Sequence, residues 1–297
     1  MNIQNNMTQI RRWTGIFSIA LVVISIALLS VRGLNLGLDF TGGLVSEFRL
    51  SPDVSQTELT QSLSPIVGDS LSIVKGGELG RWTLRYSSES RATLDQVKST
   101  LAELDTHAEV ISSSMIGAQV GDELFDQGGM AILVSMLCIM GYLCFRFEWR
   151  LASGALLALF HDVIVVLGFF ALTQQEFNLT VFAALLAILG YSLNDSIIIA
   201  DRIREQILAK LEWKTSDVIN SAVISTFSRT MVTSGTTLVT VGALWLMGGV
   251  PLQGFASAMF IGIVSGTWSS ISIATVLPEM CELKAEHYIP AEIDSNP

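Results

Sequence analysis

An aspartate stands in the middle of a strongly apolar stretch of the sequence, AILGYSLNDSIIIA (187–200). Tyr191, Asn194 and Ser196 place hydroxyl and amide groups around Asp195 along the chain. An ionisable group inside a membrane helix costs about 2.5–3.5 kcal/mol, and intramembrane carboxylates often mark proton relays. We therefore predict that Asp195 is a protonatable site. The plainer alternative is a carboxylate that only joins helices, which asparagine does at lower cost and for which Asn194 is already present.

Other polar residues in apolar runs are candidates to support Asp195. Arg229 opens the next apolar run, and an arginine that approaches or leaves a carboxylate changes how strongly that carboxylate holds a proton. The alternative for Arg229 is a positive anchor at the membrane interface. Thr233 and Thr237 follow it on a hydroxyl-rich helix that either lines a wet path or packs closely. His161 and Asp162 form a second deep pair, for which helix packing and an ionic role are equally open.

The composition of the chain indicates that most of it lies in a membrane. The 297-residue chain is 50% hydrophobic and only 15% charged, whereas soluble domains carry about 25% charged residues. Residues 33–128 contain fourteen acidic and six basic residues and so hold most of the net charge of −10. The sequence therefore predicts a polytopic membrane protein with one acidic extramembrane domain.

Six apolar runs approach the length of about 20 residues that a membrane-spanning helix needs. We predict one transmembrane helix in each of the runs 13–31, 129–145, 151–172, 179–200, 231–249 and 254–277. Arg11 and Arg12 precede the first run but no A-x-A-type cleavage site follows it, so we expect an uncleaved signal anchor.

The distribution of Lys and Arg predicts the orientation. Short loops on one side of the membrane are rich in these residues, whereas 173–178 and 250–253 contain none. By the positive-inside rule both termini are cytoplasmic. The expected segments are a cytoplasmic N-terminus with the first span (1–33), a periplasmic domain (34–127), five spans with a cytoplasmic loop 201–229 (128–277), and a cytoplasmic tail (278–297). Within the loop, SDVINSAVISTFSRT (216–230) predicts an amphipathic helix at the inner interface that turns into the fifth span.

The extramembrane domain has an alternating pattern of strands and helices. Strands are expected at 43–50, 71–75, 81–87 and 108–116, and helices at 55–66 and 91–104. The order β-α-β-β-α-β is typical of a ferredoxin-like α+β sandwich. The three cysteines lie outside this domain, which therefore has no internal disulfide.

Several stretches together resemble the SecD/SecF family of the bacterial protein-export machinery. They are LGLDFTGG (36–43), with Asp39, Gly42 and Gly43, and then RFEWR (146–150), HDV (161–163), GYSLNDSIIIADRIRE (190–205), SRTMVTSGTT (228–237) and LQGFASAMFIGIVSGTWSSISIA (252–274). The resemblance covers nearly the whole chain. One modest extramembrane domain and NDSIII in the fourth span favour the SecF branch.

This resemblance implies a six-span half-transporter of the RND superfamily in the bacterial inner membrane. Its expected partners are SecD, the SecYEG translocon with accessory subunits such as YajC, unfolded preprotein and the lipid bilayer. The family role implied is use of the proton or sodium motive force in late steps of preprotein export. Asp195 and Arg229 occupy the positions of the family's ion path. H⁺ and Na⁺ both remain open as the coupling ion, and no bound cofactor is expected.

Three other functions are compatible with parts of the sequence. A small-molecule exporter of the same superfamily would need larger extramembrane domains, since about ninety residues leave little room for a substrate pocket. An intramembrane aspartyl protease would use Asp162 and Asp195 as a dyad, but no G-x-G-D context is present. A purely structural scaffold predicts that Asp195 is dispensable. No G-x-x-x-x-G-K-[ST] motif occurs, and neither an enzyme nor a nucleic-acid partner is expected.

Overall fold

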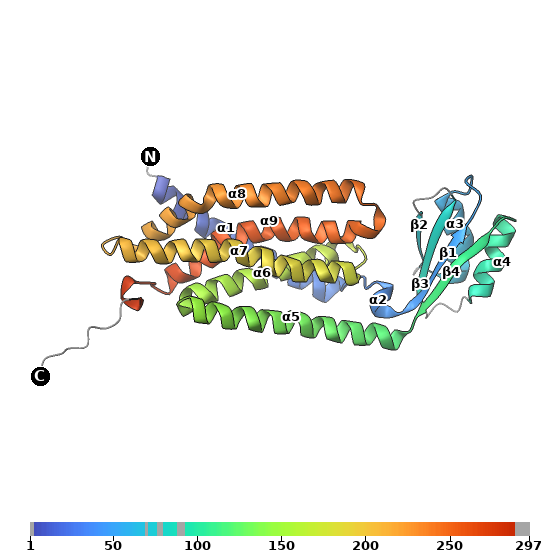
Figure 1. Ribbon diagram of the computed structural model, residues 1–297, viewed down its shortest axis with the longest axis horizontal. Coiled ribbons are helices and arrows are strands. Elements are labelled where there is room, and N and C mark those ends of the chain that lie inside the picture. Colours follow the sequence, from blue (N-terminus) through green and yellow to red (C-terminus); the bar gives the residue numbers. More distant parts are fainter. Residues whose placement is uncertain (1–2, 69–70, 76–79, 88–92, 289–297) are drawn as a thin grey trace, which may run out of the picture. The chain divides into compact units, whose positions relative to one another are not determined.

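The computed structural model describes all residues except 1–2, 69–70, 76–79, 88–92 and 289–297 (Figure 1). It divides into two compact units. One, the α+β domain, comprises Leu36–Ala131 and the short segment Phe177–Leu179; the other, the helical bundle, comprises the rest of the chain. One boundary between the two units falls inside a long helix.

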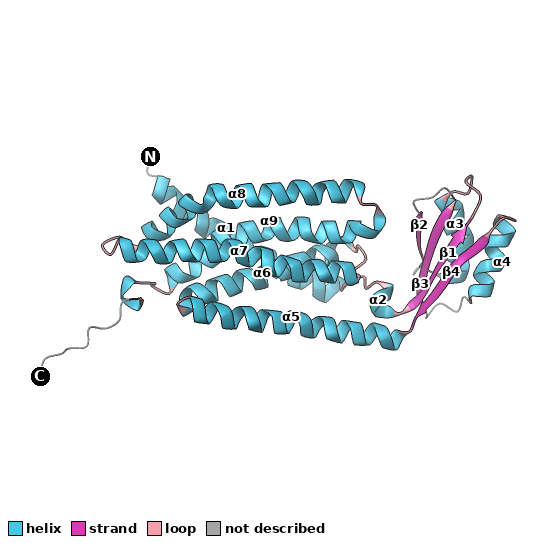
Figure 2. Ribbon diagram, in the orientation of Figure 1, coloured by secondary structure: helices cyan, strands magenta, loops and turns pink. Residues whose placement is uncertain are grey.

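The α+β domain contains one four-stranded antiparallel sheet (Figure 2). Its strand order is β2-β3-β1-β4, and β1 pairs with both β3 and β4. Together with the chain order β-α-β-β-α-β, this confirms the predicted ferredoxin-like fold. Its elements are α2 (Leu38–Thr41), β1 (Gly43–Arg49), α3 (Gln56–Val67), β2 (Ser72–Lys75), β3 (Arg81–Ser87), α4 (Leu94–Leu104) and β4 (Glu109–Ile116).

Local sequence signals explain where the helices of this domain begin and what they bury. Ser55 and Thr93 each start a helix through a capping box, with Glu58 and Gln96 as the partners three residues on. Every second residue of β3 is buried, and the apolar faces of α3 and α4 join these residues in one core. The expected turn at Gly76-Gly77 lies outside the described residues.

Asp105 closes the end of α4 with hydrogen bonds to backbone. Its carboxylate accepts N–H groups from His107 at 3.0 Å and Ser51 at 2.6 Å. These backbone bonds, that from His107 first, lower the pKa of Asp105 to about 2. The folded state thus favours the ionised form, so this stabilisation is complete above the unfolded pKa of about 3.9 and is lost as the pH falls towards 2.

We expect Asp105→Asn to remove this acid-dependent loss of stability from the α+β domain. Hydrogen exchange of β1 and β3 peptides between pH 5 and 2 measures the effect, after correction for the intrinsic pH dependence of exchange. Asp53→Asn is the control, because Asp53 is exposed in a loop. An unchanged acid profile in the Asp105 variant would contradict the assignment.

The helical bundle is built from long apolar helices. Six helices of the described residues are long and apolar enough to cross a membrane, as predicted. They are α1 (Ile3–Arg32), α5 (Ala118–Arg146), α6 (Trp149–Thr173), α7 (Leu179–Ala209), α8 (Thr215–Met247) and α9 (Val250–Met280), and a 3₁₀ turn η1 (Ala285–His287) follows. The backbones of α6 and α9 pack closely, with α1 and α8 beside them.

The path of α8 differs from the prediction. The expected interfacial helix and the fifth span form one unbroken helix of 33 residues, so the predicted turn near Arg229 is wrong. No Gly or Pro occurs between Thr215 and Ser234 to interrupt it. The start of α8 also packs into the bundle instead of lying on its surface: Val218, Ala222 and neighbouring apolar residues form a fully buried core with α7.

Candidate functional site in the transmembrane bundle

Asp195 lies on the buried face of α7. Its side chain is 2% exposed, and Ser192 and Ser196 on the same face are also buried. The Oδ2 atom of Asp195 and the Oγ atom of Ser196 have no hydrogen-bond partner in the described part of the chain. A buried polar atom without a partner costs about 1–3 kcal/mol. A proton, ion or water molecule therefore gains more by binding here than at a satisfied group.

Arg229 stands near Asp195 without forming an ion pair with it. Arg229 and Ser234 of α8 are both close enough to interact electrostatically with Asp195. No nitrogen of Arg229 lies within 4 Å of the Asp195 carboxylate, and Arg229 is exposed on the surface of this chain. The two residues of the predicted pair are thus near each other but are not in ion-pair contact.

Tyr191 connects α7 with α8 one turn before Asp195. Its hydroxyl lies 3.4 Å from the Ser234 hydroxyl and 3.5 Å from that of Thr237, both as acceptors. Ser234 is hydrogen-bonded in turn to Thr267 of α9 at 2.7 Å. Tyr191 and Thr237, both predicted as supporting residues, therefore belong to a chain of hydroxyls that joins three helices.

Two of the predicted supporting residues do not join this chain. Asn194 is exposed, because a one-residue step rotates a helix by about 100° and carries it off the buried face of Asp195. The hydroxyl of Thr233 donates to the carbonyl of Arg229, at 3.1 Å, within α8 itself. Asn194 and Thr233 therefore lie outside this chain of hydroxyls, and their supporting role stays a prediction.

Asp162 of α6 has the opposite environment to Asp195. It is fully buried and accepts hydrogen bonds from the hydroxyls of Ser192 at 2.5 Å, Ser265 at 2.7 Å and Ser269 at 2.9 Å. The His161 Nδ1 atom lies 3.0 Å from its other side. The carboxylate of Asp162 therefore joins α6, α7 and α9, with both oxygens occupied.

Glycines of α9 allow α7 to come this close. A Cβ atom on Gly262 would lie 2.4 Å from Ile188, and one on Gly266 would lie 3.0 Å from Ser192. Ser265 and Ser269 were not singled out from the sequence. Their spacing of four residues in SGTWSS, which places two hydroxyls on one helix face, was the available signal.

The LGLDFTGG segment lies at the base of the α+β domain. Gly42 has a φ of +71°, a conformation that favours glycine. A Cβ on Gly43 would lie 2.4 Å from the Tyr86 carbonyl oxygen, so the start of β1 approaches β3 too closely for a side chain. Asp39 does not stay within its own segment, since its Oδ2 accepts the backbone N–H of Leu179 at 2.9 Å.

Comparison with known proteins covers nearly all of this architecture. The family model "Protein export membrane protein SecD/SecF, C-terminal" matches residues 96–283, and "SecD/SecF GG Motif" matches residues 27–54. The protein translocase subunit SecF of Vibrio alginolyticus is 38% identical over 95% of this chain and 92% of its own length. The chain belongs to the SecF family.

Other members and a solved structure agree with that assignment. The SecF subunit of Calditerrivibrio nitroreducens is 41% identical over 88% of this chain and 89% of its own. The crystal structure of SecDF from Thermus thermophilus, described as a translocon-associated membrane protein, matches with a TM-score of 0.77 and 32% identity. This SecF-family chain is covered to 93% but spans only 38% of that SecDF chain.

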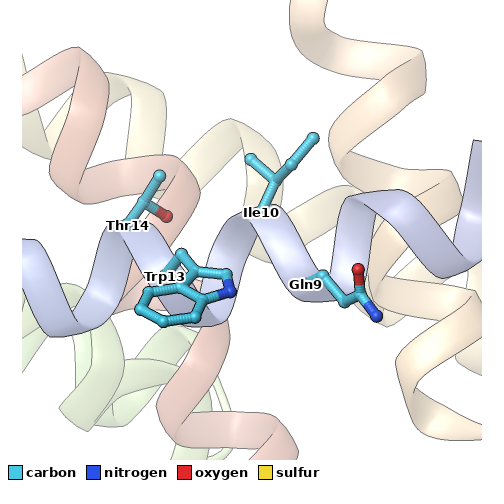
Figure 3. Close-up of a pocket in the computed structure, with 4 residues that line it drawn as sticks. All are labelled: Gln9, Ile10, Trp13 and Thr14. Atoms are coloured by element: carbon cyan, nitrogen blue, oxygen red, sulfur yellow. The ribbon is translucent and has the colours of Figure 1, made fainter.

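A hollow on this SecF-family chain lies away from these carboxylates. It is lined by Gln9, Ile10, Trp13 and Thr14 of α1 and has a volume of about 410 Å³ (Figure 3). Trp13 is 72% exposed and no titratable side chain lines the hollow. It is a shallow depression on the surface of α1, and neither Asp195 nor Asp162 lines it.

The Asp162 cluster predicts a structural cost that can be measured. Asp162→Ala removes the acceptor of three hydroxyls and a histidine, and hydrogen bonds in membranes average about 0.6 kcal/mol each. We expect the free energy of unfolding in detergent to fall by about 2 kcal/mol. Ser30→Ala is the control, because the Ser30 hydroxyl bonds only to the Ile26 carbonyl of its own helix. Equal stability of the two variants would contradict this role.

Proposed function

We propose that this SecF-family chain pairs with SecD to form an ion-driven auxiliary unit of the Sec export machinery. The unit would use the proton or sodium motive force to promote late steps of preprotein translocation across the inner membrane. The observation that carries the proposal is the buried carboxylate of Asp195, whose Oδ2 has no hydrogen-bond partner among the described residues. Membership of the SecF family indicates preprotein export as the process, and the Oδ2 atom of Asp195 offers a place where an ion can bind.

The position of Arg229, near Asp195 but not in an ion pair with it, supports an ion-exchange step at Asp195. With Asp195 ionised, Arg229 is attracted towards it; with Asp195 neutralised by a proton or a cation, that attraction is lost. One charge that crosses 100 mV of membrane potential supplies about 2.3 kcal/mol. That is enough to shift a two-state arrangement of the helices whose states differ by a few kcal/mol.

The orientation and further partners are part of the same proposal. Both termini would lie in the cytoplasm and the α+β domain in the periplasm, because the basic loops then face the cytoplasm. The translocon association stated for the Thermus SecDF suggests SecYEG, with YajC as an accessory subunit, as the neighbouring complex. Preprotein would be handled on the periplasmic side.

An intramembrane protease is the less favourable interpretation of the two aspartates. A catalytic dyad needs two carboxylates that share a proton. Both oxygens of Asp162 are instead occupied by Ser192, Ser265, Ser269 and His161. We therefore assign no catalytic residue.

Depletion of this chain in its own cells tests the general function. We expect unprocessed preproteins to accumulate while resistance to small toxic molecules stays unchanged. Pulse-chase labelling of secreted proteins and growth on a panel of drugs measure the two outcomes. Drug sensitivity with normal export would favour a small-molecule exporter of the same superfamily and overturn the proposal.

A further inference from the structure

We infer that the GG-motif segment, residues 36–43, is the joint that transmits movement of α7 to the α+β domain. This inference rests on the proposed function, because it says how an ion event at Asp195 reaches the domain. It begins from the short segment Phe177–Leu179, which belongs to the α+β domain although it leads directly into α7.

Backbone and aromatic contacts hold this short segment. Leu36 forms a parallel bridge with Phe177, and the Gly37 N–H donates to the Phe177 carbonyl at 2.9 Å. The Phe40 ring stacks on the Phe177 ring with centroids 6.0 Å apart, and Phe125 meets Phe40 edge-on at 5.8 Å. Both Phe40 and Phe177 are buried. Residues almost 140 positions apart in sequence therefore form one packed unit.

Asp39 adds a hydrogen bond to Leu179, the first residue of α7. Its carboxylate accepts the N–H of Leu179 at 2.9 Å. The first N–H groups of a helix have no acceptor within the helix, and a negative charge there is favoured by the helix dipole. Asp39 reaches Leu179 from a segment about 140 residues earlier in the chain. The bond from Asp39 therefore serves to attach α7 to the domain.

Gly42 and Gly43, which follow Asp39 in the GG-motif segment, keep the connection from Asp39 to β1 short. After the single turn of α2, Gly42 reverses the chain and Gly43 begins β1, which lies between β3 and β4 in the sheet (Figure 1). A Cβ on Gly121 of α5 would lie 2.2 Å from the Phe40 carbonyl oxygen. Only three residues lie between Asp39 and β1, so a shift of the Leu179 end of α7 pulls directly on an inner strand.

The other end of the connection is Asp195. It lies sixteen residues after Leu179 in the same unbroken helix, a distance of about 24 Å along the axis. No proline interrupts α7 between Leu179 and Asp195, so a displacement of the helix near Asp195 also displaces Leu179. The GG-motif segment is then the point where that displacement enters the α+β domain.

The experiment separates ion movement from the work that it drives. Asp39→Ala, Asp39→Asn and Asp39→Glu are compared in vesicles that contain this chain, SecD and SecYEG. Ion uptake under an imposed potential is measured with both H⁺ and Na⁺, and gradient-driven release of a preprotein is measured in the same vesicles. Asp195→Asn is run in parallel. Asn35→Ala is the matched control, because Asn35 donates to the carbonyl of Gln174, the residue that ends α6.

We expect Asp39→Ala to keep ion uptake within about twofold of the unaltered protein while preprotein release falls at least tenfold. Asp39→Asn keeps an acceptor without its charge and gives an intermediate loss, and Asp39→Glu restores much of the release. Asn35→Ala changes neither measurement. Normal preprotein release by Asp39→Ala would overturn the proposal that the GG-motif segment transmits the movement of α7.

Two further results would overturn it as well. Loss of uptake and release together in the Asp39 variants would place Asp39 in the ion path or in the assembly of the complex, not between ion movement and export. Failure of both Asp39→Ala and Asp39→Asn to assemble with SecD would assign it a structural role only. Failure of the proposed function itself is recognised separately, because Asp195→Asn would then release preprotein normally.

Discussion

Asp195→Asn is expected to abolish gradient-driven preprotein release while leaving the protein folded and paired with SecD. Asparagine has nearly the same shape as aspartate and keeps one acceptor oxygen, but it cannot exchange a proton and carries no charge to attract Arg229. The carboxylate oxygen that lacks a partner is the group under test. The export that remains should equal the export measured without an ion gradient.

The measurement is preprotein release from vesicles with and without an imposed gradient, together with the thermal stability of the purified complex. Asp201→Asn is the matched control, because Asp201 lies six residues further along α7 but is exposed and paired with Arg146 at 2.6 Å. We expect this control to keep its response to the gradient. Normal gradient-driven release by Asp195→Asn would favour the scaffold alternative and remove the ion-coupling role.

A substitution of Arg229 tests the same ion-coupling step at Asp195. Arg229→Lys retains the positive charge but loses the planar fork of five donors. If attraction between charges is sufficient, the lysine variant retains most of the gradient response. If two-pronged hydrogen bonding to Asp195 is needed in another state of the cycle, the response is lost as in Asp195→Asn. Uptake measured with H⁺ and with Na⁺ identifies the ion in the same vesicles.

Local patterns were sufficient to predict the ferredoxin-like domain and the number of apolar helices. Alternation in β3 and the capping box at Ser55 act over a few residues, so they can be recognised without tertiary structure. The course of α8 could not be recognised in this way. Its first turns look amphipathic because α7 covers their apolar face, and an interfacial helix has the same pattern.

The candidate site was only partly predictable for a related reason. Asp195 is conspicuous because a charge interrupts an apolar run, whereas the sequence alone does not show that Asn194 beside it points to a different face of the helix. Ser265 and Ser269 reach Asp162 from a helix more than a hundred residues away. Serines are common in membrane helices, so no pattern in α9 alone indicates which of them bond to a carboxylate.

Arg11 is the clearest feature that sequence interpretation missed, since it was assigned only to the basic cytoplasmic side of the first span. Its side chain is completely buried and bonds to three residues. The guanidinium group donates to Asn220 at 2.9 Å, to the Thr275 hydroxyl at 3.3 Å and to Glu279 at 2.6 Å. It therefore joins α1, α8 and α9 at one end of the bundle.

We expect Arg11→Ala to lower the free energy of unfolding by about 3–5 kcal/mol, because it leaves Glu279 as a largely buried charge without its main partner. Glu279 is only 16% exposed. Arg12→Ala is the matched control: Arg12 approaches the same carboxylate at 3.5 Å but is 69% exposed. An exposed pair of this kind is worth about 0–1 kcal/mol. Unfolding by denaturant in detergent measures both, and equal losses would contradict the distinction.

The double variant Arg11→Leu/Glu279→Leu distinguishes two contributions to stability. One is the cost of leaving the Glu279 charge buried without a partner, and the other is the net stabilisation by the Arg11–Glu279 pair. When both members of a buried pair become apolar, stability often recovers, because neither charge has to be removed from water. We expect the double variant to lie at least 2 kcal/mol above Arg11→Ala. If it is instead as unstable as Arg11→Ala, the bonds from Arg11 to Asn220 and Thr275 hold α1 against the bundle, and the charge of Glu279 contributes little.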